Sequence, residues 1–373
     1  MSDPLPRPDN ANAADGQAGG RPPLQLEYST TTADPVADGE EMIALWRTGL
    51  SQDGMPVAKL EWYYCRNPEG TPLVVFLRHR STPQAVAVAT AGPRRFRFGA
   101  KILKAGALVD FVARPEHRTF FPAIFLQKEL LRRARDSHAI LFGFPNAKSL
   151  AIVRRIGYRC VGQMVRRTRV LRSSAYLDKF LPKWLSGVVG AVTDGFRSAA
   201  MSLRTLVHAG FQSRWQDRPN DAFDQLWQRA VVPDVVIGVR DKAFLTWRFV
   251  DSPRGTFRFF VLESSTAPSL VAFAVCAQVG PALHVEDFLV DPALPSAGPR
   301  LWLDLSREAI RMGCNSLSVE FLGSDLQQRQ LGALGLLARE QRPVYAFVAQ
   351  SSGGEAVLPT AVSNWYLTSA DDD

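Results

Sequence analysis

From residue 40 onward, hydrophobic residues either alternate with polar ones or recur at helical steps. The stretch from Leu108 to Tyr158 is the most regular, and it predicts four elements in alternation: a strand at 108–113, a helix that ends near Arg135, a strand at 140–144 and a helix at 147–156. A sharp turn at residues 114–118 joins the first strand to the first helix. Because a helix N-terminus presents free N–H donors, this strand–turn–helix order favours an anion-binding site.

The same order of elements occurs twice in the chain. Two spacings recur in both copies: six residues from Trp62 to Pro68 and from Trp247 to Pro253 (68−62 and 253−247), then five from Asp110 to Pro115 and from Asp287 to Pro292 (115−110 and 292−287). Repeats of this kind indicate duplicated structural units. We therefore expect four segments: a disordered tail at 1–36, a first domain at 37–171, a helical linker at 172–218 and a second domain at 219–373.

The tail, the linker and the end of the chain carry further expectations. The tail is rich in Pro, Gly, Asp and Ala, and it has too few large apolar residues to offset its ordering entropy by burial. Residues 179–204 of the linker form a basic amphipathic pattern with two interpretations: a helix on a membrane surface, or a helix pair packed across both domains. Residues 364–367, Asn-Trp-Tyr-Leu, are expected to dock on a domain because exposed aromatic surface is costly.

Composition narrows the classes of partner. The 373 residues carry 44 Lys and Arg against 36 Asp and Glu, and the net charge of +8 favours anionic partners. Nucleic acid is the least favoured of these, because no nucleic-acid motif accompanies the charge. The four cysteines and five histidines lack metal-ligand spacing, so we expect no metal site. No apolar run reaches the roughly 20 residues that span a bilayer. We expect a cytoplasmic protein, with peripheral contact to the inner membrane through residues 179–204 as the open alternative.

The turn after the first strand is the first candidate site. Arg114, His117 and Arg118 supply positive charge where helix N–H groups would meet a pyrophosphate. The sequence Arg118-Thr119-Phe120-Phe121-Pro122-Ala123 stands where the GNAT (GCN5-related) acyltransferases have Arg/Gln-x-x-Gly-x-Gly/Ala, and the order of elements resembles their acyl-CoA-binding half. Phe121 replaces the first glycine of that pattern, and Pro122 removes one N–H donor. The alternative interpretation is an amphipathic helix with proline in its first turn.

The resemblance implies an acyl-CoA co-substrate and a set of contacts to it. The turn would hold the CoA pyrophosphate, and the start of the next helix would lie beside the pantetheine arm. The cofactor-binding candidates are Val112, Arg114, His117, Arg118, Ala123, Asn146 and Ser149. Asn146 is also well placed to cap the helix at 147–156. Val153 stands where the family often has a tyrosine that protonates the leaving thiolate.

Asp110, near the end of an apolar strand, is the candidate catalytic residue. A carboxylate there would deprotonate an attacking amine directly or through water. The alternative is a structural carboxylate paired with a basic neighbour, which the matching Asp287 of the second copy favours. Glu286 is a further acid on that second strand. The candidate substrate-contacting residues are the aromatic residues Trp62, Tyr64 and Trp247, which we expect near a cleft between the copies. The alternative is that they pack in the core.

Together these patterns predict an α/β protein of two tandem GNAT-like domains, each a mixed, mostly antiparallel sheet flanked by helices. The resemblance implies acyl transfer from acetyl-CoA or another acyl-CoA to an amine or hydroxyl acceptor, such as a sugar or a polysaccharide precursor bound between the domains. The alternative is a non-catalytic GNAT-like scaffold that binds an anionic partner or a membrane-associated biosynthesis complex. The first copy is the expected CoA site, because the second has no counterpart of the turn at 118–123.

Overall fold

The computed structural model describes residues 27–49, 56–172, 210–266, 269–349 and 364–372. The first half contains β1 (Tyr28–Ala33), α1 (Gly39–Trp46), α2 (Pro56–Lys59), the π-helical turn η2 (Leu60–Cys65), β2 (Leu73–His79), β3 (Ala85–Phe98), β4 (Lys101–Ala113), the 3-10 turn η3 (Pro115–His117), α3 (Phe120–Ala134), β5 (Ile140–Gly143), α4 (Ala147–Arg155) and β6 (Arg159–Val170). The second half contains β7 (Phe211–Gln216), α7 (Asp221–Arg229), β8 (Val236–Gly238), α8 (Lys242–Leu245), the π-helical turn η4 (Thr246–Val250), β9 (Arg258–Ser264), β10 (Leu270–Val279), β11 (Ala282–Val290), α9 (Ala297–Arg311), β12 (Ser316–Leu322), α10 (Asp325–Ala333), β13 (Leu337–Val348), β14 (Trp365–Thr368) and the 3-10 turn η5 (Ser369–Asp371).

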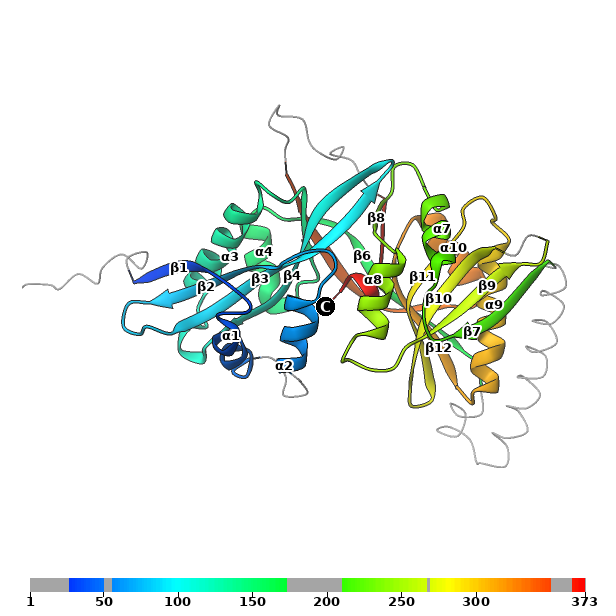
Figure 1. Ribbon diagram of the computed structural model, residues 1–373, viewed down its shortest axis with the longest axis horizontal. Helices are drawn as coiled ribbons and strands as arrows, with labels where there is room; N and C mark the ends of the chain where they lie inside the picture. Colours follow the sequence, from blue (N-terminus) through cyan, green and yellow to red (C-terminus); the bar gives the residue numbers. More distant parts are fainter. Residues whose placement is uncertain (1–26, 50–55, 173–209, 267–268, 350–363, 373) are drawn as a thin grey trace, which may run out of the picture.

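The two halves repeat one order of elements and lie side by side in an elongated molecule (Figure 1). From the π-helical turn onward, η2, β2, β3, β4, α3, β5, α4 and β6 correspond to η4, β9, β10, β11, α9, β12, α10 and β13. The strand and helix predictions for residues 108–158 are confirmed by β4, α3, β5 and α4, with β4 beginning earlier than expected, at Lys101. The repeat read from the two spacings is therefore present in the structure.

The last strand of each half is exchanged with the other half. β6, from the first half, pairs antiparallel with β12 of the second, while β13 pairs antiparallel with β5 of the first. β6 and β13 also pair with each other along most of their length, so the strands form one continuous sheet. The prediction that each copy would hold its own sheet is therefore not confirmed. The mixed, mostly antiparallel character of the sheet is as expected.

In each half two parallel strands separate after a short ladder. β4 pairs with β5 only from Ala105 to Ala107, and β11 pairs with β12 only from Ala282 to Val285. In the second half the gap beyond this point holds β14, which pairs antiparallel with β12. In the first half no described strand pairs with β4 beyond Ala107 on the side that faces β5. The two halves thus differ in what occupies the gap between their parting strands.

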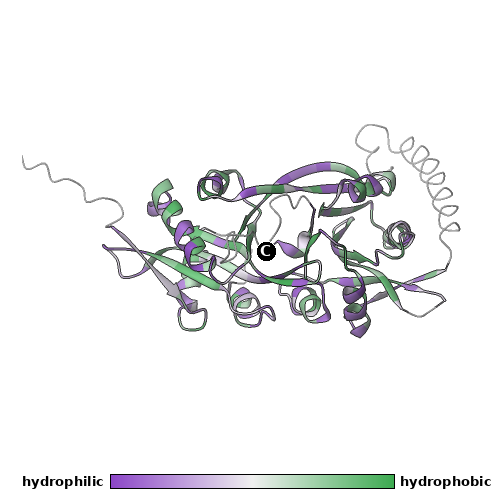
Figure 2. Ribbon diagram, turned by 90° about the horizontal axis from the view of Figure 1, so that it is seen from above, coloured by the Kyte–Doolittle hydropathy of each residue, from purple (hydrophilic) through white to green (hydrophobic). Residues whose placement is uncertain are grey.

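Helices cover both faces of the sheet, as the view from above shows (Figure 2). Successive residues of a strand point to opposite faces. Val75 and Leu77 of β2 accordingly join the cluster beneath α3 and α4, while Val74 and Phe76 join the cluster beneath α1 and η2. The second cluster continues through the other half of the molecule and includes β14. A shared core therefore ties the halves together on this face.

Two expectations about the ends of the domains are changed by the structure. Residues 28–33, placed in the disordered tail, form strand β1 because they pair along their whole length with β2. Residues 211–216, placed in the helical linker, form strand β7 on the edge of β9. The proposed amphipathic helix at 179–204 lies outside the described residues and stays a prediction, as do the domain boundaries. Among the residues that are described, no helix has the length and apolar character needed to cross a membrane.

The docking of the C-terminal aromatic residues is confirmed. Trp365, Tyr366 and Leu367 are all buried in β14. The Trp365 ring packs edge-on against Phe96, and the Tyr366 ring contacts Phe321. The C-terminus therefore lies in the middle of the molecule, between the halves (Figure 1).

Candidate functional site

The predicted anion-binding turn lies between the end of β4 and the start of α3. Its cationic side chains contact other parts of the protein. The Arg118 guanidinium donates to the carbonyls of Ala113 and Thr48, and the Arg114 Nε donates to the Ala85 carbonyl at 3.2 Å. The His117 Nδ1 lies 2.9 Å from the Tyr28 hydroxyl. Burial lowers the pKa of His117, and His79 nearby acts in the same direction. The side chains expected to hold a phosphate therefore bond to other parts of the protein and stabilise the turn.

Phe121 and Pro122 are the two residues that depart from the expected pattern of this turn. The Phe121 ring stacks on Phe125, with centroids 6.1 Å apart, and lies 6.4 Å from the Tyr28 ring. Phe121 thus packs toward β1 and its own helix. Pro122 is buried and lacks an N–H, but Phe120 and Phe121 keep the free amides of a first helical turn. The helix N-terminus therefore still presents donors beside the half-exposed Phe120.

The remaining cofactor candidates lie on either side of the gap between β4 and β5. Val112 is buried and pairs with Val88, and Ala123 begins the intrahelical ladder of α3. Asn146 caps α4, since its Oδ1 accepts the amides of Lys148 and Ser149 at 3.0 Å each. The capping role considered for Asn146 is therefore present. Its side chain remains exposed at the rim of the gap.

Asp110 sits at a bulge in β4 where the ladder with β3 shifts register. Its φ is +51°, a left-handed conformation that Asp tolerates better than most residues. One carboxylate oxygen lies 2.6 Å from the Lys59 Nζ, and the other accepts the Tyr64 hydroxyl at 2.5 Å. The side chain is almost fully buried. Asp110 and Tyr64 are thus brought together, inside the protein.

Asp287, the counterpart of Asp110, has an equivalent environment in the second half. One of its oxygens accepts the Arg240 Nε at 2.9 Å and the Thr368 hydroxyl at 2.7 Å. Burial raises the pKa of Asp287 above its ordinary value, although Arg240 acts in the opposite direction. In both halves a cation and a hydroxyl therefore hold the carboxylate at the corresponding place. The recurrence favours a structural role at this position.

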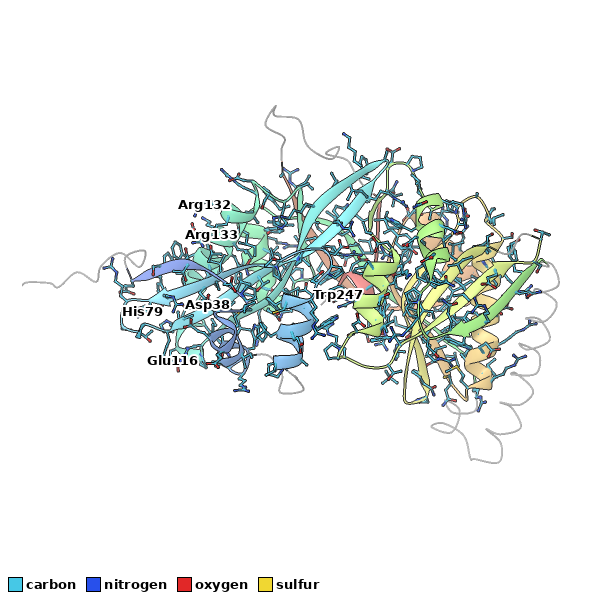
Figure 3. The ribbon with its side chains drawn as sticks, viewed as in Figure 1. Asp38, His79, Glu116, Arg132, Arg133 and Trp247 are labelled. Carbon is cyan, nitrogen blue, oxygen red and sulfur yellow. The ribbon has the colours of Figure 1, made fainter. Side chains whose placement is uncertain are left out.

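Trp62 and Trp247 form a reciprocal pair at the junction of the halves. Their rings stack with centroids 4.9 Å apart, and each indole N–H donates to the other residue's backbone carbonyl, at 2.7 and 2.9 Å. Both side chains are buried. Figure 3 places Trp247 at this junction and Glu116, next to the predicted turn, at the outer end of the first half. Little of either indole is left for contact with an acceptor. A cavity of about 780 Å³ nevertheless opens beside Trp247, lined by residues of both halves.

A second cavity, of about 440 Å³, lies in the second half and was missed as a site from the sequence. His284 and Glu286 line it from β11, two residues apart and so on one face of the strand. Guanidinium groups surround them, from Arg166, Arg248, Arg254 and Arg342. The available signal was the alternation His284-x-Glu286 within an otherwise apolar strand. The exchanged strand β6 of the first half supplies Arg166, which a reading of one domain at a time would not place there.

Comparisons with known proteins identify the fold. A GCN5-related N-acetyltransferase from Anabaena variabilis is 12% identical, with a TM-score of 0.59 over 86% of this chain and 72% of that one. A tandem GNAT protein from the clavulanic acid biosynthesis pathway is 12% identical, with a TM-score of 0.50 over 87% of this chain and 100% of that one. N-myristoyltransferase from Saccharomyces cerevisiae, solved with bound myristoyl-CoA, is also 12% identical, with a TM-score of 0.51 and coverages of 87% and 83%.

No family model matches the sequence, and no curated protein matches it either. At these identities the likeness concerns the fold alone. The predicted GNAT resemblance is confirmed at that level: the chain has a mixed α/β fold similar to those of GCN5-related N-acetyltransferases and of a tandem GNAT protein.

Proposed function

We propose that the protein is an acyltransferase that binds acyl-CoA in the gap between β4 and β5 of its first half. The observation that carries the proposal is that no described strand pairs with β4 beyond Ala107 on the side that faces β5, and that this edge is followed, after η3, by the N-terminus of α3. An extended ligand with amide groups pairs with such an edge as an added strand would. The pantetheine arm of CoA is a ligand of this kind. Its pyrophosphate would then meet the donors at the start of α3.

The second half supports this assignment by contrast. Its corresponding gap holds β14, a strand of the protein itself, in the place where an extended ligand would lie. The Tyr366 hydroxyl donates to the Phe288 carbonyl of β11, so the segment is bonded to both walls of the gap. We therefore place acyl-CoA in the first half only. From the resemblance of the fold we propose that the acceptor is an amine or hydroxyl compound, such as a sugar, and that it binds between the halves.

In this reaction the acceptor nitrogen or oxygen attacks the thioester carbonyl, a new amide or ester bond forms, and the thiolate of CoA leaves. The attacking group loses one proton, and the thiolate gains one. Asp110 is the proposed residue for the first transfer. Its two bonds to Lys59 and Tyr64 mean that a proton would reach it through this buried network.

The test is calorimetric titration of the full chain with CoA, acetyl-CoA and longer acyl-CoAs. The variant Phe120→Glu places a negative charge at the exposed first position of α3, where it stabilises the helix but repels a pyrophosphate. We expect at least about a tenfold weaker affinity for acyl-CoA. Leu326→Glu in the first turn of α10, also at an exposed hydrophobic residue, is the matched control and should bind as the unmodified protein does.

Two results would overturn the proposal: no heat with any acyl-CoA, or equal affinities in Phe120→Glu and Leu326→Glu. The alternative of a non-catalytic scaffold would then account for the engaged side chains of Arg114, His117 and Arg118. Co-sedimentation with anionic vesicles would test that alternative.

A further inference from the structure

The cavity of about 440 Å³ in the second half contains two acid–base residues, His284 and Glu286. Across the part of the chain that the structure describes, no hydrogen bond or ion pair reaches the Glu286 carboxylate or the Nε2 of His284. His284 is fixed through its other nitrogen, which lies 2.5 Å from the Ser318 hydroxyl. Both residues line the cavity and both are partly buried. A carboxylate withdrawn from water without a partner is unfavourable, unless a ligand supplies one.

The fold itself does not require polar residues at these positions. When Asp110 is aligned with Asp287, each residue pair of the β4–β5 ladder corresponds to one pair of the β11–β12 ladder. The first half then has apolar residues throughout where the second half has polar ones: Ala107, Val109, Phe142 and Phe144 against His284, Glu286, Ser318 and Glu320. In the π-helical turn Tyr63 corresponds to Arg248, and in the loop after it the acidic Glu69 corresponds to the basic Arg254. The polar cavity is therefore a property of the second half's sequence and not of the architecture.

The charges around the cavity have both signs. Burial raises the pKa of Glu286 above its ordinary value, with Arg248 and Arg254 acting in the opposite direction. Arg342 is paired with Glu320 at 2.8 Å, and it also bonds to Asp372. Arg254 is exposed, Arg166 is partly exposed and pairs with Glu340 at 3.5 Å, and Arg248 is buried, while Glu286 is partly buried. Such an arrangement complements a molecule that carries one positive and one negative group.

Other occupants fit less well. Within the described residues, no three His, Cys, Asp or Glu side chains are grouped so that they could hold a metal ion. A CoA arm cannot reach the cavity through the gap between β11 and β12, because β14 fills it, and Ser369 and Asp372 beyond β14 form part of the cavity wall. The volume lies within the range of small-molecule sites.

We propose that this cavity is a binding site for a small zwitterion of the α-amino acid class, with its ammonium group against Glu286 and its carboxylate against the guanidinium groups of Arg254 and Arg166. His284 Nε2 provides a further hydrogen bond to the ligand. The site is separate from the proposed acyl-CoA site, and it assigns the second half a binding role that needs no thioester.

The experiment is calorimetric titration and thermal unfolding of the full chain with individual amino acids at up to about 10 mM. At least one amino acid is expected to bind and to raise the midpoint of unfolding. Its N-acetyl derivative and its decarboxylated amine each lack one charge, and each should bind at least about tenfold more weakly. Affinity should also fall as the pH is lowered through the raised pKa of Glu286, because the ligand's ammonium then meets a neutral carboxyl.

Glu286→Gln keeps the shape of the side chain and removes its charge, and it should weaken binding at least about tenfold. Glu308→Gln on α9, outside the cavity, is the matched control and should bind as the unmodified protein does. Phe120→Glu should leave amino-acid binding unchanged, so this proposal and the acyl-CoA proposal can fail separately. The absence of binding by every amino acid, or unaltered affinity in Glu286→Gln with its fold intact by circular dichroism, would overturn the inference.

Discussion

Asp110 occupies a backbone position that limits which side chains can replace it. The bulge gives it a φ of +51°, and its carboxylate receives bonds from Lys59 and Tyr64 on the π-helical side of the sheet. The residue thus fixes the course of β4 a few residues after β4 separates from β5. A structural and a catalytic role at this position can be separated by two substitutions.

Asp110→Asn keeps the side-chain shape and a residue type that tolerates positive φ, but it removes the charge that pairs with Lys59. We expect a loss of about 1–3 kcal/mol in the free energy of unfolding. Asp110→Ala should lose more, because alanine adopts positive φ at a further cost. Urea unfolding of both variants measures these losses. An unchanged free energy of unfolding in Asp110→Asn, combined with loss of acyl transfer, would instead favour the catalytic role.

At the scale of elements, the C-terminal segment β14–η5 is held by two buried ion pairs of Asp371. Asp371 lies 2.7 Å from Arg240 and 2.8 Å from Arg94, and all three side chains are almost completely buried. Arg94 comes from β3 of the first half, whereas Arg240 follows β8 of the second. One carboxylate therefore connects both halves to the end of the chain.

Burial alone would raise the pKa of Asp371, but Arg240 and Arg94 together hold it below its ordinary value. A carboxyl with a depressed folded pKa stabilises the fold above its unfolded pKa of about 3.9, and this stabilisation is lost as the pH falls through the folded pKa. Asp371→Asn should therefore cost about 3–5 kcal/mol at neutral pH, since it leaves two buried cations with one partner fewer. The difference from the unmodified protein should shrink below about pH 4. Denaturant unfolding across this range measures it.

Asp136→Asn is the control for that prediction. Asp136 is largely exposed beside Arg135, and its replacement should leave the unfolding midpoint unchanged. A loss in Asp371→Asn that stays constant down to the lowest accessible pH would contradict the assigned ion pairs.

Elements with local signals were predictable, and elements defined by distant partners were not. α3 and α4 show helical apolar spacing, and Asn146 is a strong capping residue, so both helices were expected close to where they lie. β1 reads Tyr-Ser-Thr-Thr-Thr-Ala, which has little apolar character, and it is ordered by its ladder with β2, whose partners lie 41 to 51 residues away (74−33 and 79−28). The docking of Trp365 to Leu367 followed from their hydrophobicity. Their position beside β12 did not, because it depends on partners such as Phe288 and Phe321.

At the scale of the whole molecule, the exchange of β6 and β13 had no sequence signal. Each strand follows its own half's last helix by a few residues, so pairing within the half is the simplest expectation. The choice of partner depends on side chains far apart in sequence, such as Arg167, which bonds to Gln328 and to the Leu336 carbonyl. For the same reason the cavity around Glu286 could not be assembled from one copy, since Arg166 reaches it only through the exchange.

The exchange predicts a single cooperative thermal transition for the whole chain. Each half supplies a strand to the other's sheet, and the larger core cluster extends from Ala33 to Ala370 through both halves. Neither half can unfold and leave the other's sheet complete, so no intermediate with one folded half should accumulate. Scanning calorimetry should give one peak with equal calorimetric and van't Hoff enthalpies, and Asp371→Asn should shift that whole peak downward. Two resolved peaks, of which the variant moves only one, would show that the halves unfold independently and that the exchanged strands do not couple them.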